Sequence, residues 1–278
     1  MSGDPAGARP AFSPGPRGLS VATFGSPADP TVVLVHGSMD RGSSLRSTAR
    51  RLAGEAHVVL YDRRGYGRSR QIGGPFDVET NVADLVAVLD GRPAVVFGHS
   101  LGGDIALAAA QRHPELIRAV GAYEPPMSWE PWWPEVTAGS EAVERAEQAG
   151  TEEAAEMFMR RMIGDELWGR LPATTRAERR AEGAALVGEL VDMRRAAPYD
   201  TAAIAVPIVL ACGEHGAAHH RRAAAILRER LATSATDGRV VFEEVPGTGH
   251  GIHLQDPEAL AGLVRRLLAL VEPELRAP

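Results

Sequence analysis

The sequence lacks the residues and segments that mark several large classes of protein. Cys212 is its only cysteine, which excludes an intrachain disulfide and any CxxC metal site. No run approaches the ~18 uninterrupted apolar residues that a membrane-spanning helix needs. Residues 1–25 hold Pro, Gly and Arg but no apolar segment, so they do not resemble a signal peptide. We therefore expect a cytoplasmic protein that does not associate with a membrane.

Lysine is absent altogether, so all 30 basic residues are Arg, and 36 acidic residues outnumber them. The net charge is −6, and the Arg residues are scattered among Glu and Asp. Nucleic-acid binders normally carry a concentrated basic field, so we do not expect nucleic acid as a partner. The 44% of hydrophobic residues is ordinary for a globular protein. At 278 residues the chain is slightly longer than the ~200–250 that a bare α/β domain uses.

Short apolar runs bounded by turn residues recur along the chain, and most are hydrophobic on both faces, as buried parallel strands are. They cover Thr31–His36, His57–Tyr61, Ala94–Gly98, Arg118–Tyr123, Pro207–Cys212 and Arg239–Val245. Helical patterns alternate with them at Thr80–Leu89, Leu101–Arg112, Arg221–Leu231 and Pro257–Leu270. Asp256 stands where the last helix needs an N-cap. This alternation predicts right-handed crossovers and a parallel sheet.

The alternation stops between Tyr123 and Pro207, where about 75 residues hold no strand-like run. Stretches such as Glu152–Ile163 and Arg176–Arg195 predict a helical insertion packed over the sheet. Residues 1–17 are rich in Pro and Gly and predict a disordered leader. The predicted organisation is a leader at 1–17, a core at 18–124 and 206–278, and a helical cap at 125–205.

A G-x-S-x-G pattern, Gly98-His99-Ser100-Leu101-Gly102, follows one predicted strand and opens the next helix. Small residues are needed on both sides of the serine, because side chains would clash in so tight a turn. The Ser100 hydroxyl then stands at a helix N-terminus, whose positive end favours developing negative charge. The pattern and its strand–turn–helix context together predict a nucleophilic serine.

Three further segments, taken with this turn, resemble the α/β-hydrolase superfamily from about Leu19 to the C-terminus. They are His36-Gly37-Ser38 at the end of an early strand, the D-x-R-G-x-G-x-S loop Asp62–Ser69, and Gly247-Thr248-Gly249-His250 late in the chain. The resemblance implies a doubly wound, mostly parallel sheet with a helical cap inserted after the sixth strand. It also implies an enzyme of the serine-nucleophile, cap-bearing branch that includes esterases and lactonases.

The resemblance assigns roles to individual residues near the elbow. Ser100 is then the nucleophile, and the backbone N–H groups of Ser38 and Leu101 form the oxyanion hole. The Ser38 hydroxyl could add a third donor.

The same resemblance makes His250 the general base, since a serine hydroxyl is a weak nucleophile until a base takes its proton. His253 lies three residues further on and remains a competitor. His36 and the loop Asp62–Ser69 are expected to brace the floor of the site.

The acid that would orient the histidine is not where the superfamily usually has it. The usual position is an Asp in a G-x-x-D turn after the strand Pro207–Cys212, but this chain has Gly213-Glu214-His215-Gly216 there. Glu124 directly follows another strand, a position from which some superfamily members, including haloalkane dehalogenases and zearalenone-type lactone hydrolases, take their acid. We therefore expect a Ser-His-Glu triad with Glu124. Glu214, a dyad and a broken triad remain alternatives.

Histidines also gather at His215, His219 and His220, but their spacing matches no zinc pattern and HEXXH is absent, so no metal or other cofactor is expected. The insertion opens on the tryptophan cluster Trp129, Trp132 and Trp133. We expect this cluster to line an apolar substrate pocket, with packing inside the cap as the alternative.

The sequence therefore predicts a serine hydrolase that cleaves a small, apolar carboxylic ester or lactone through an acyl-enzyme. The serine at the elbow excludes haloalkane dehalogenases and epoxide hydrolases, which use Asp there. C–C bond hydrolysis, thioester cleavage and cyclisation of a biosynthetic intermediate are alternatives on the same triad. A non-catalytic binding protein is a further alternative, supported only by Gly216.

Overall fold

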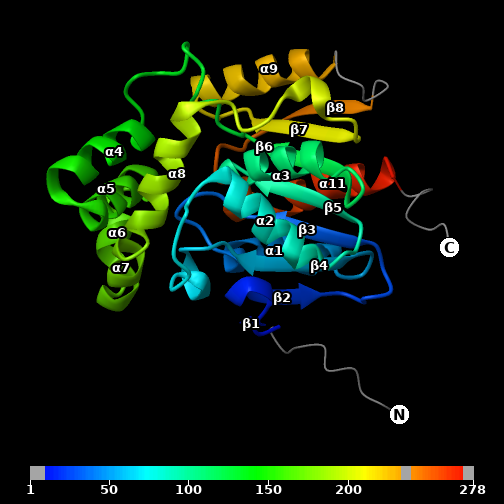
Figure 1. The fold of residues 1–278 in the computed structure, drawn as a ribbon, viewed down its shortest axis with the longest axis horizontal. Coiled ribbons are helices and arrows are strands. Elements are labelled where there is room, and N and C mark those ends of the chain that lie inside the picture. Colours follow the sequence, from blue (N-terminus) through cyan, green and yellow to red (C-terminus); the bar gives the residue numbers. More distant parts are fainter. Residues whose placement is uncertain (1–9, 233–238, 272–278) are drawn as a thin grey trace.

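A computed structural model describes residues 10–232 and 239–271 of the chain. Within these ranges, strands form one sheet in the order β1-β2-β4-β3-β5-β6-β7-β8 (Figure 1). The strands from β3 to β8 are parallel, whereas β2 is antiparallel to both β1 and β4. Their bounds are β1 Ser13–Pro14, β2 Ser20–Phe24, β3 Thr31–Val35, β4 His57–Asp62, β5 Ala94–His99, β6 Ile117–Tyr123, β7 Ile208–Gly213 and β8 Val240–Val245.

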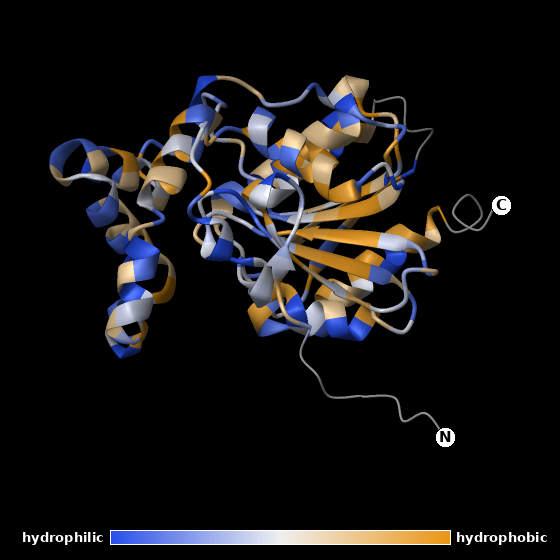
Figure 2. Ribbon diagram, turned by 60° about the horizontal axis from the view of Figure 1, so that its bottom comes forward, coloured by the Kyte–Doolittle hydropathy of each residue, from blue (hydrophilic) through white to orange (hydrophobic). Residues whose placement is uncertain are grey.

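The six strands expected from apolar runs are confirmed as β3 to β8, and burial explains why the sequence reveals them. All residues of β4, β5 and β7 are buried. A strand covered on both faces needs a continuous apolar run, and Figure 2 shows hydrophobic residues concentrated in the central strands. The antiparallel β2 was not expected, because its sequence SVATF is short and buries only alternate residues.

Helices cover both faces of the sheet, as a doubly wound fold requires. On β3, Val33 and Val35 pack into one hydrophobic cluster with α2, α3 and α9, whereas Val32 and Leu34 pack into another with α1 and α11. The bounds are α1 Arg46–Leu52, α2 Val78–Leu89, α3 Leu101–Arg112, α9 Ala218–Ala232, α10 Ile252–Gln255 and α11 Pro257–Ala269. The four helices predicted among these strands are confirmed; α1 and α10 were not expected. No helix in the described ranges is both long and apolar enough to cross a membrane.

A helical cap follows β6, as the resemblance implied, and stands to one side of the sheet (Figure 1). It has a small core of its own around the fully buried Trp168, which also includes Met39 and Tyr66 from loops of the sheet domain. These two residues anchor the cap to the loops that follow β3 and β4. The cap helices are α4 Ala138–Ala149, α5 Thr151–Ile163, α6 Asp165–Arg170, α7 Ala173–Arg180 and α8 Gly183–Arg195.

The single helix expected over Arg176–Arg195 is wrong, because the chain breaks between α7 and α8. Directly after the break, the backbone at Gly183 packs so closely on α5 that a Cβ would lie 2.0 Å from the Thr151 carbonyl oxygen. The segment is also held by the buried Glu182 carboxylate, which accepts from the Arg41 guanidinium at 2.8 Å. Both contacts are tertiary, so the helical periodicity of the sequence does not reveal them.

The disordered leader expected over residues 1–17 is wrong where the structure describes it, at residues 10–17. Residues 1–9 lie outside the described residues. Ser13 and Pro14 form β1, which pairs with β2, and a 3-10 turn follows at Pro16–Gly18. The Phe12 ring packs against the guanidinium groups of two arginines from the sheet domain, which gives this Pro-rich segment a partner.

We predict that replacing Asp256 by Ala destabilises the fold by about 1 kcal/mol, the usual effect of losing a helix N-cap. The Asp256 carboxylate accepts from the backbone N–H groups of Glu258 at 3.1 Å and Ala259 at 2.9 Å, which confirms the expected cap of α11. Urea unfolding followed by circular dichroism measures the change. Asp256→Asn, which keeps a capping oxygen, should stay close to the wild type; equal loss in both variants would contradict the capping role.

Candidate active site

Ser100 lies at the turn between β5 and α3, in a backbone conformation that few residues adopt. Its φ is 53° and its ψ is −129°. A Cβ at Gly98 would lie 2.0 Å from the Gly102 carbonyl oxygen, and a Cβ at Gly102 would lie 2.3 Å from the Val35 carbonyl oxygen. The predicted need for glycine on both sides of the serine is therefore met by backbone contacts. The strained turn presents the Ser100 side chain at the start of α3, facing a cavity.

His250 lies on the loop after β8, and its ring is held by Glu124. The His250 Nδ1 and the Glu124 Oε2 are 2.7 Å apart. Glu124 is fully buried directly after β6, with a φ of 46°, and its Oε1 accepts the Gly213 N–H at 2.9 Å. With the Nδ1–H donated to the carboxylate, the other ring nitrogen of His250 is left to act as an acceptor.

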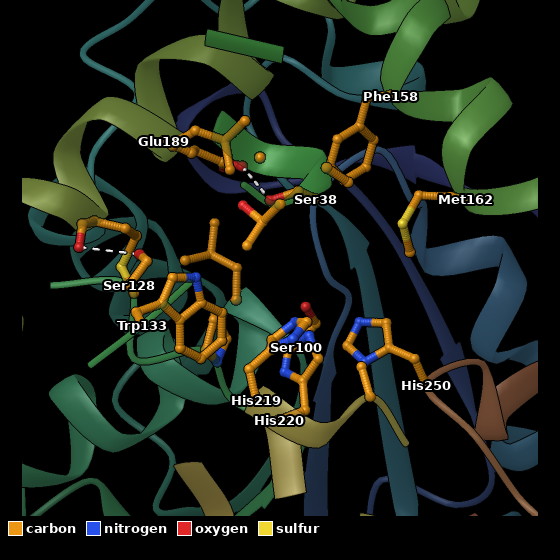
Figure 3. A pocket seen from close by; sticks show the side chains of 18 of the residues that line it. Ser38, Ser100, Ser128, Trp133, Phe158, Met162, Glu189, His219, His220 and His250 are labelled. Carbon is orange, nitrogen blue, oxygen red and sulfur yellow. Dashed lines mark hydrogen bonds between the residues drawn. The ribbon is translucent and has the colours of Figure 1, made fainter. Parts of the chain in front are cut away.

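Ser100 and His250 line the same cavity, although within the described residues no hydrogen bond joins their side chains (Figure 3). In free enzymes such bonds are often long and tighten only when substrate binds. Leu101 and Ser38 line this cavity as well. Leu101 is the first residue of α3, so its N–H has no partner within the helix and can bind an anionic oxygen.

The Ser38 hydroxyl does not serve as the spare donor that the sequence suggested. It donates to the Glu189 Oε2 at 2.9 Å (Figure 3). Glu189 belongs to the cap helix α8 and is buried; it also accepts from the Tyr66 hydroxyl at 2.7 Å and forms an ion pair with Arg63. Sequence reasoning missed Glu189. The only signal was a single acidic residue within the mostly apolar stretch 185–190.

His36 and the loop after β4 brace this network, as expected. The His36 Nε2 accepts the Arg63 backbone N–H at 2.9 Å, and its Nδ1 donates to the Gly37 carbonyl at 2.7 Å. Burial lowers the pKa of His36 to about 4, so the ring is neutral and keeps both bonds. The Arg63 Nε also donates to the His36 carbonyl at 2.9 Å, which ties the ends of β3 and β4 together.

The cavity measures about 350 Å³ and is mainly apolar on the side of the cap. Of the three tryptophans expected to line it, only Trp133 does so. Trp129 instead packs edge-on against Tyr199, with ring centroids 5.8 Å apart, and Trp132 lies beneath the Arg222 guanidinium at 4.5 Å. The apolar residues of the cap wall also include Phe158, Met162, Leu190 and Met193, of which sequence reasoning did not single out Leu190 and Met193.

The alternative acid and the alternative base lie apart from this arrangement. Glu214 is exposed, and its carboxylate accepts the Gly247 N–H at 2.8 Å rather than contacting His250. The His253 Nε2 lies 3.2 Å from the Asp40 Oδ2. Cys212 is buried, and burial raises the pKa of its thiol to about 11.

Among the described residues, two groups of side chains bring possible metal-ligand atoms within 4.8 Å of one another: Asp40, His99 and His253, and Glu124, His220 and His250. Each group already contains a close histidine–carboxylate pair. Neither follows a zinc-binding spacing along the chain.

Comparison with known proteins identifies the family of the chain. A model of the "Alpha/beta hydrolase family" matches residues 32–263, which is most of the chain. An uncharacterized hydrolase, YraK of Bacillus subtilis (strain 168), is 40% identical over 102 residues, covering 34% of this chain and 37% of the relative. A pimeloyl-[acyl-carrier protein] methyl ester esterase of Chromobacterium violaceum is 35% identical over 145 residues, covering 51% of this chain and 56% of the relative.

These alignments span only about a third to a little over half of the length of each curated relative. The similarity in fold covers more of the chain than these sequence alignments do. The crystal structure of an enol-lactonase from Burkholderia xenovorans LB400 superimposes with a TM-score of 0.71 at 21% identity, covering 91% of this chain and 98% of that one. The family model matches residues 32–263 and the fold agrees with it. The chain therefore belongs to the alpha/beta hydrolase family of enzymes.

Proposed function

We propose that this protein is a serine hydrolase that cleaves a carboxylic ester or lactone through an acyl-enzyme, with Ser100, His250 and Glu124 as its triad. The observation that carries the proposal is the 2.7 Å contact of the buried Glu124 with the His250 Nδ1, next to a cavity shared with Ser100. This contact gives a neutral imidazole the tautomer in which its second nitrogen can accept a proton. The named activities of an esterase relative and an enol-lactonase structural neighbour support the same chemistry.

In the first half of the reaction, the Ser100 Oγ attacks the carbonyl carbon while its proton passes to the His250 Nε2. The carbonyl oxygen becomes an oxyanion, which accepts from the backbone N–H groups of Leu101 and Ser38. Glu124 stabilises the resulting imidazolium. The intermediate collapses when His250 gives that proton to the leaving oxygen, so the alcohol departs and the acyl group stays on Ser100.

In the second half, His250 removes a proton from a water molecule, which attacks the acyl carbon. A second oxyanion forms in the same place, and its collapse returns the proton to the Ser100 Oγ and releases the carboxylic acid. For a lactone the alcohol and the acid belong to one product. The apolar side chains of the cap wall favour a substrate with a hydrocarbon portion, and Arg161 and Arg194 also line the cavity.

Packing around Glu124 supports its role as the acid and explains the glycine at the usual acid position. A Cβ at Gly216 would lie 2.1 Å from the Glu124 Oε1. An Asp side chain at 216 and the Glu124 carboxylate therefore exclude each other. Because glycine has no side chain, position 216 leaves room for the carboxylate of Glu124, which follows β6.

We predict that Ser100→Ala lowers ester hydrolysis at least about a thousand-fold and abolishes covalent labelling by a fluorophosphonate, since the nucleophile is gone. Turnover of an aryl ester and labelling followed by mass spectrometry measure the two effects. Ser128→Ala is the matched control, because Ser128 lines the same cavity and donates to the Met193 carbonyl at 3.2 Å. Full esterase activity in the Ser100 variant would refute the proposal.

We predict that Glu124→Gln lowers kcat by about 10³- to 10⁴-fold, because a neutral amide does not stabilise the imidazolium and can favour the wrong tautomer. Glu214→Gln should change kcat less than about two-fold, since Glu214 is exposed and does not contact His250, and substitutions at such surface positions have small effects. Steady-state kinetics on one aryl ester compares the variants. The reverse ranking would transfer the acid role to Glu214.

We predict that Gly216→Ala lowers kcat about 10- to 100-fold, because the new methyl group displaces the Glu124 carboxylate and with it the imidazole. Gly251→Ala is the control from the histidine loop, where a Cβ has no neighbour closer than 3.8 Å. If the Gly216 variant stays folded and keeps wild-type kcat, the argument from packing fails.

A further inference from the structure

A second imidazole faces His250 inside the cavity. His220 lies in the first turn of α9, and its ring stacks on that of His250 with centroids 4.6 Å apart and planes 25° apart (Figure 3). The ring of His99 also approaches His250, at 4.8 Å, but its plane is tilted by 47°. His220 thus offers a nearly parallel ring surface to the proposed general base.

The surroundings of His220 are mainly other aromatic rings. Its Nδ1 is buried and has no hydrogen-bond partner among the described residues. Its ring contacts those of His219 at 4.6 Å and Trp133 at 5.5 Å. Burial lowers the pKa of His220 well below its usual value, so the ring is neutral at pH 7.

The bond to Glu124 cannot by itself fix the plane of the His250 ring. The ring turns about its Cβ–Cγ bond, a torsion with broad preferences, and the hydrogen bond to Glu124 restrains that torsion only at Nδ1, on one edge of the ring. A parallel ring on one face limits this rotation. The same neutral ring attracts the positive charge that His250 carries when it has taken the serine proton.

We propose that His220 is a positioning residue, whose ring fixes the plane of the His250 imidazole and stabilises its protonated form by stacking. The proposal rests on the function proposed above, because it requires His250 to be the general base. It assigns the role to the aromatic surface of His220 and not to its nitrogens.

The test compares two substitutions of different shape. His220→Leu removes the aromatic surface at similar volume and should lower kcat about 10- to 100-fold, while KM changes less than about two-fold. His220→Phe keeps an aromatic ring without nitrogens and should restore most of the lost kcat. Arg221→Leu, an exposed neighbour on the same turn, is the control for adding Leu to this helix and should match the wild type.

The rate constant for fluorophosphonate labelling gives a second readout of the same step, because Ser100 reacts only when His250 takes its proton. It should fall in the Leu variant in proportion to kcat and recover in the Phe variant. Should the Leu variant fail to fold, His220→Gln replaces it as the non-aromatic variant.

Two results would overturn the proposal: a folded non-aromatic variant with wild-type kcat, or a Phe variant as impaired as the Leu variant. A change confined to KM would also overturn it, since that outcome describes a residue that only lines the pocket. Absence of both hydrolysis and labelling in the wild type would instead refute the proposed function, so the two failures are distinguishable.

Discussion

The buried carboxylate of Glu124 is the constraint around which the rest of the site is arranged. It lies at the end of β6 in a left-handed backbone conformation, bound to the Gly213 N–H on one oxygen and to His250 on the other. A buried carboxylate is costly unless both oxygens have partners. This requirement ties together the ends of β6 and β7 and the histidine loop, and it leaves room at 216 for no side chain larger than that of glycine.

A second buried carboxylate connects the cap to the same region. Glu189 on α8 is paired with Arg63 and accepts from Tyr66 and Ser38, so the cap is joined to the loop that would supply the oxyanion hole. Separating this buried ion pair would leave an uncompensated charge in the interior, which is strongly unfavourable. The pair therefore holds this part of the cap against the sheet domain. The wall of the pocket and the loop that follows β3 are therefore parts of one packed unit.

The regular elements of the core are visible in the sequence because their burial is visible there. Continuous apolar runs gave the parallel strands, and helical periodicity gave α2, α3, α9 and α11. The short antiparallel β2, the arginine-rich α1 and the break at Gly183 were missed. Each depends on neighbours distant in the sequence: β4 for β2, α11 for α1, and the Thr151 carbonyl for Gly183.

By itself, the sequence determined the elbow around Ser100, because a strained turn with flanking glycines is a local property. It also marked His250 as the candidate base, and it limited the candidates for the proposed triad acid to Glu124 and Glu214. Only the tertiary structure brought Glu124 rather than Glu214 to the histidine. In the same way it put one tryptophan of three into the cavity and brought in Glu189 and His220. These choices depend on how the ends of separate strands and the cap helices pack together, and no local pattern along the chain records that packing.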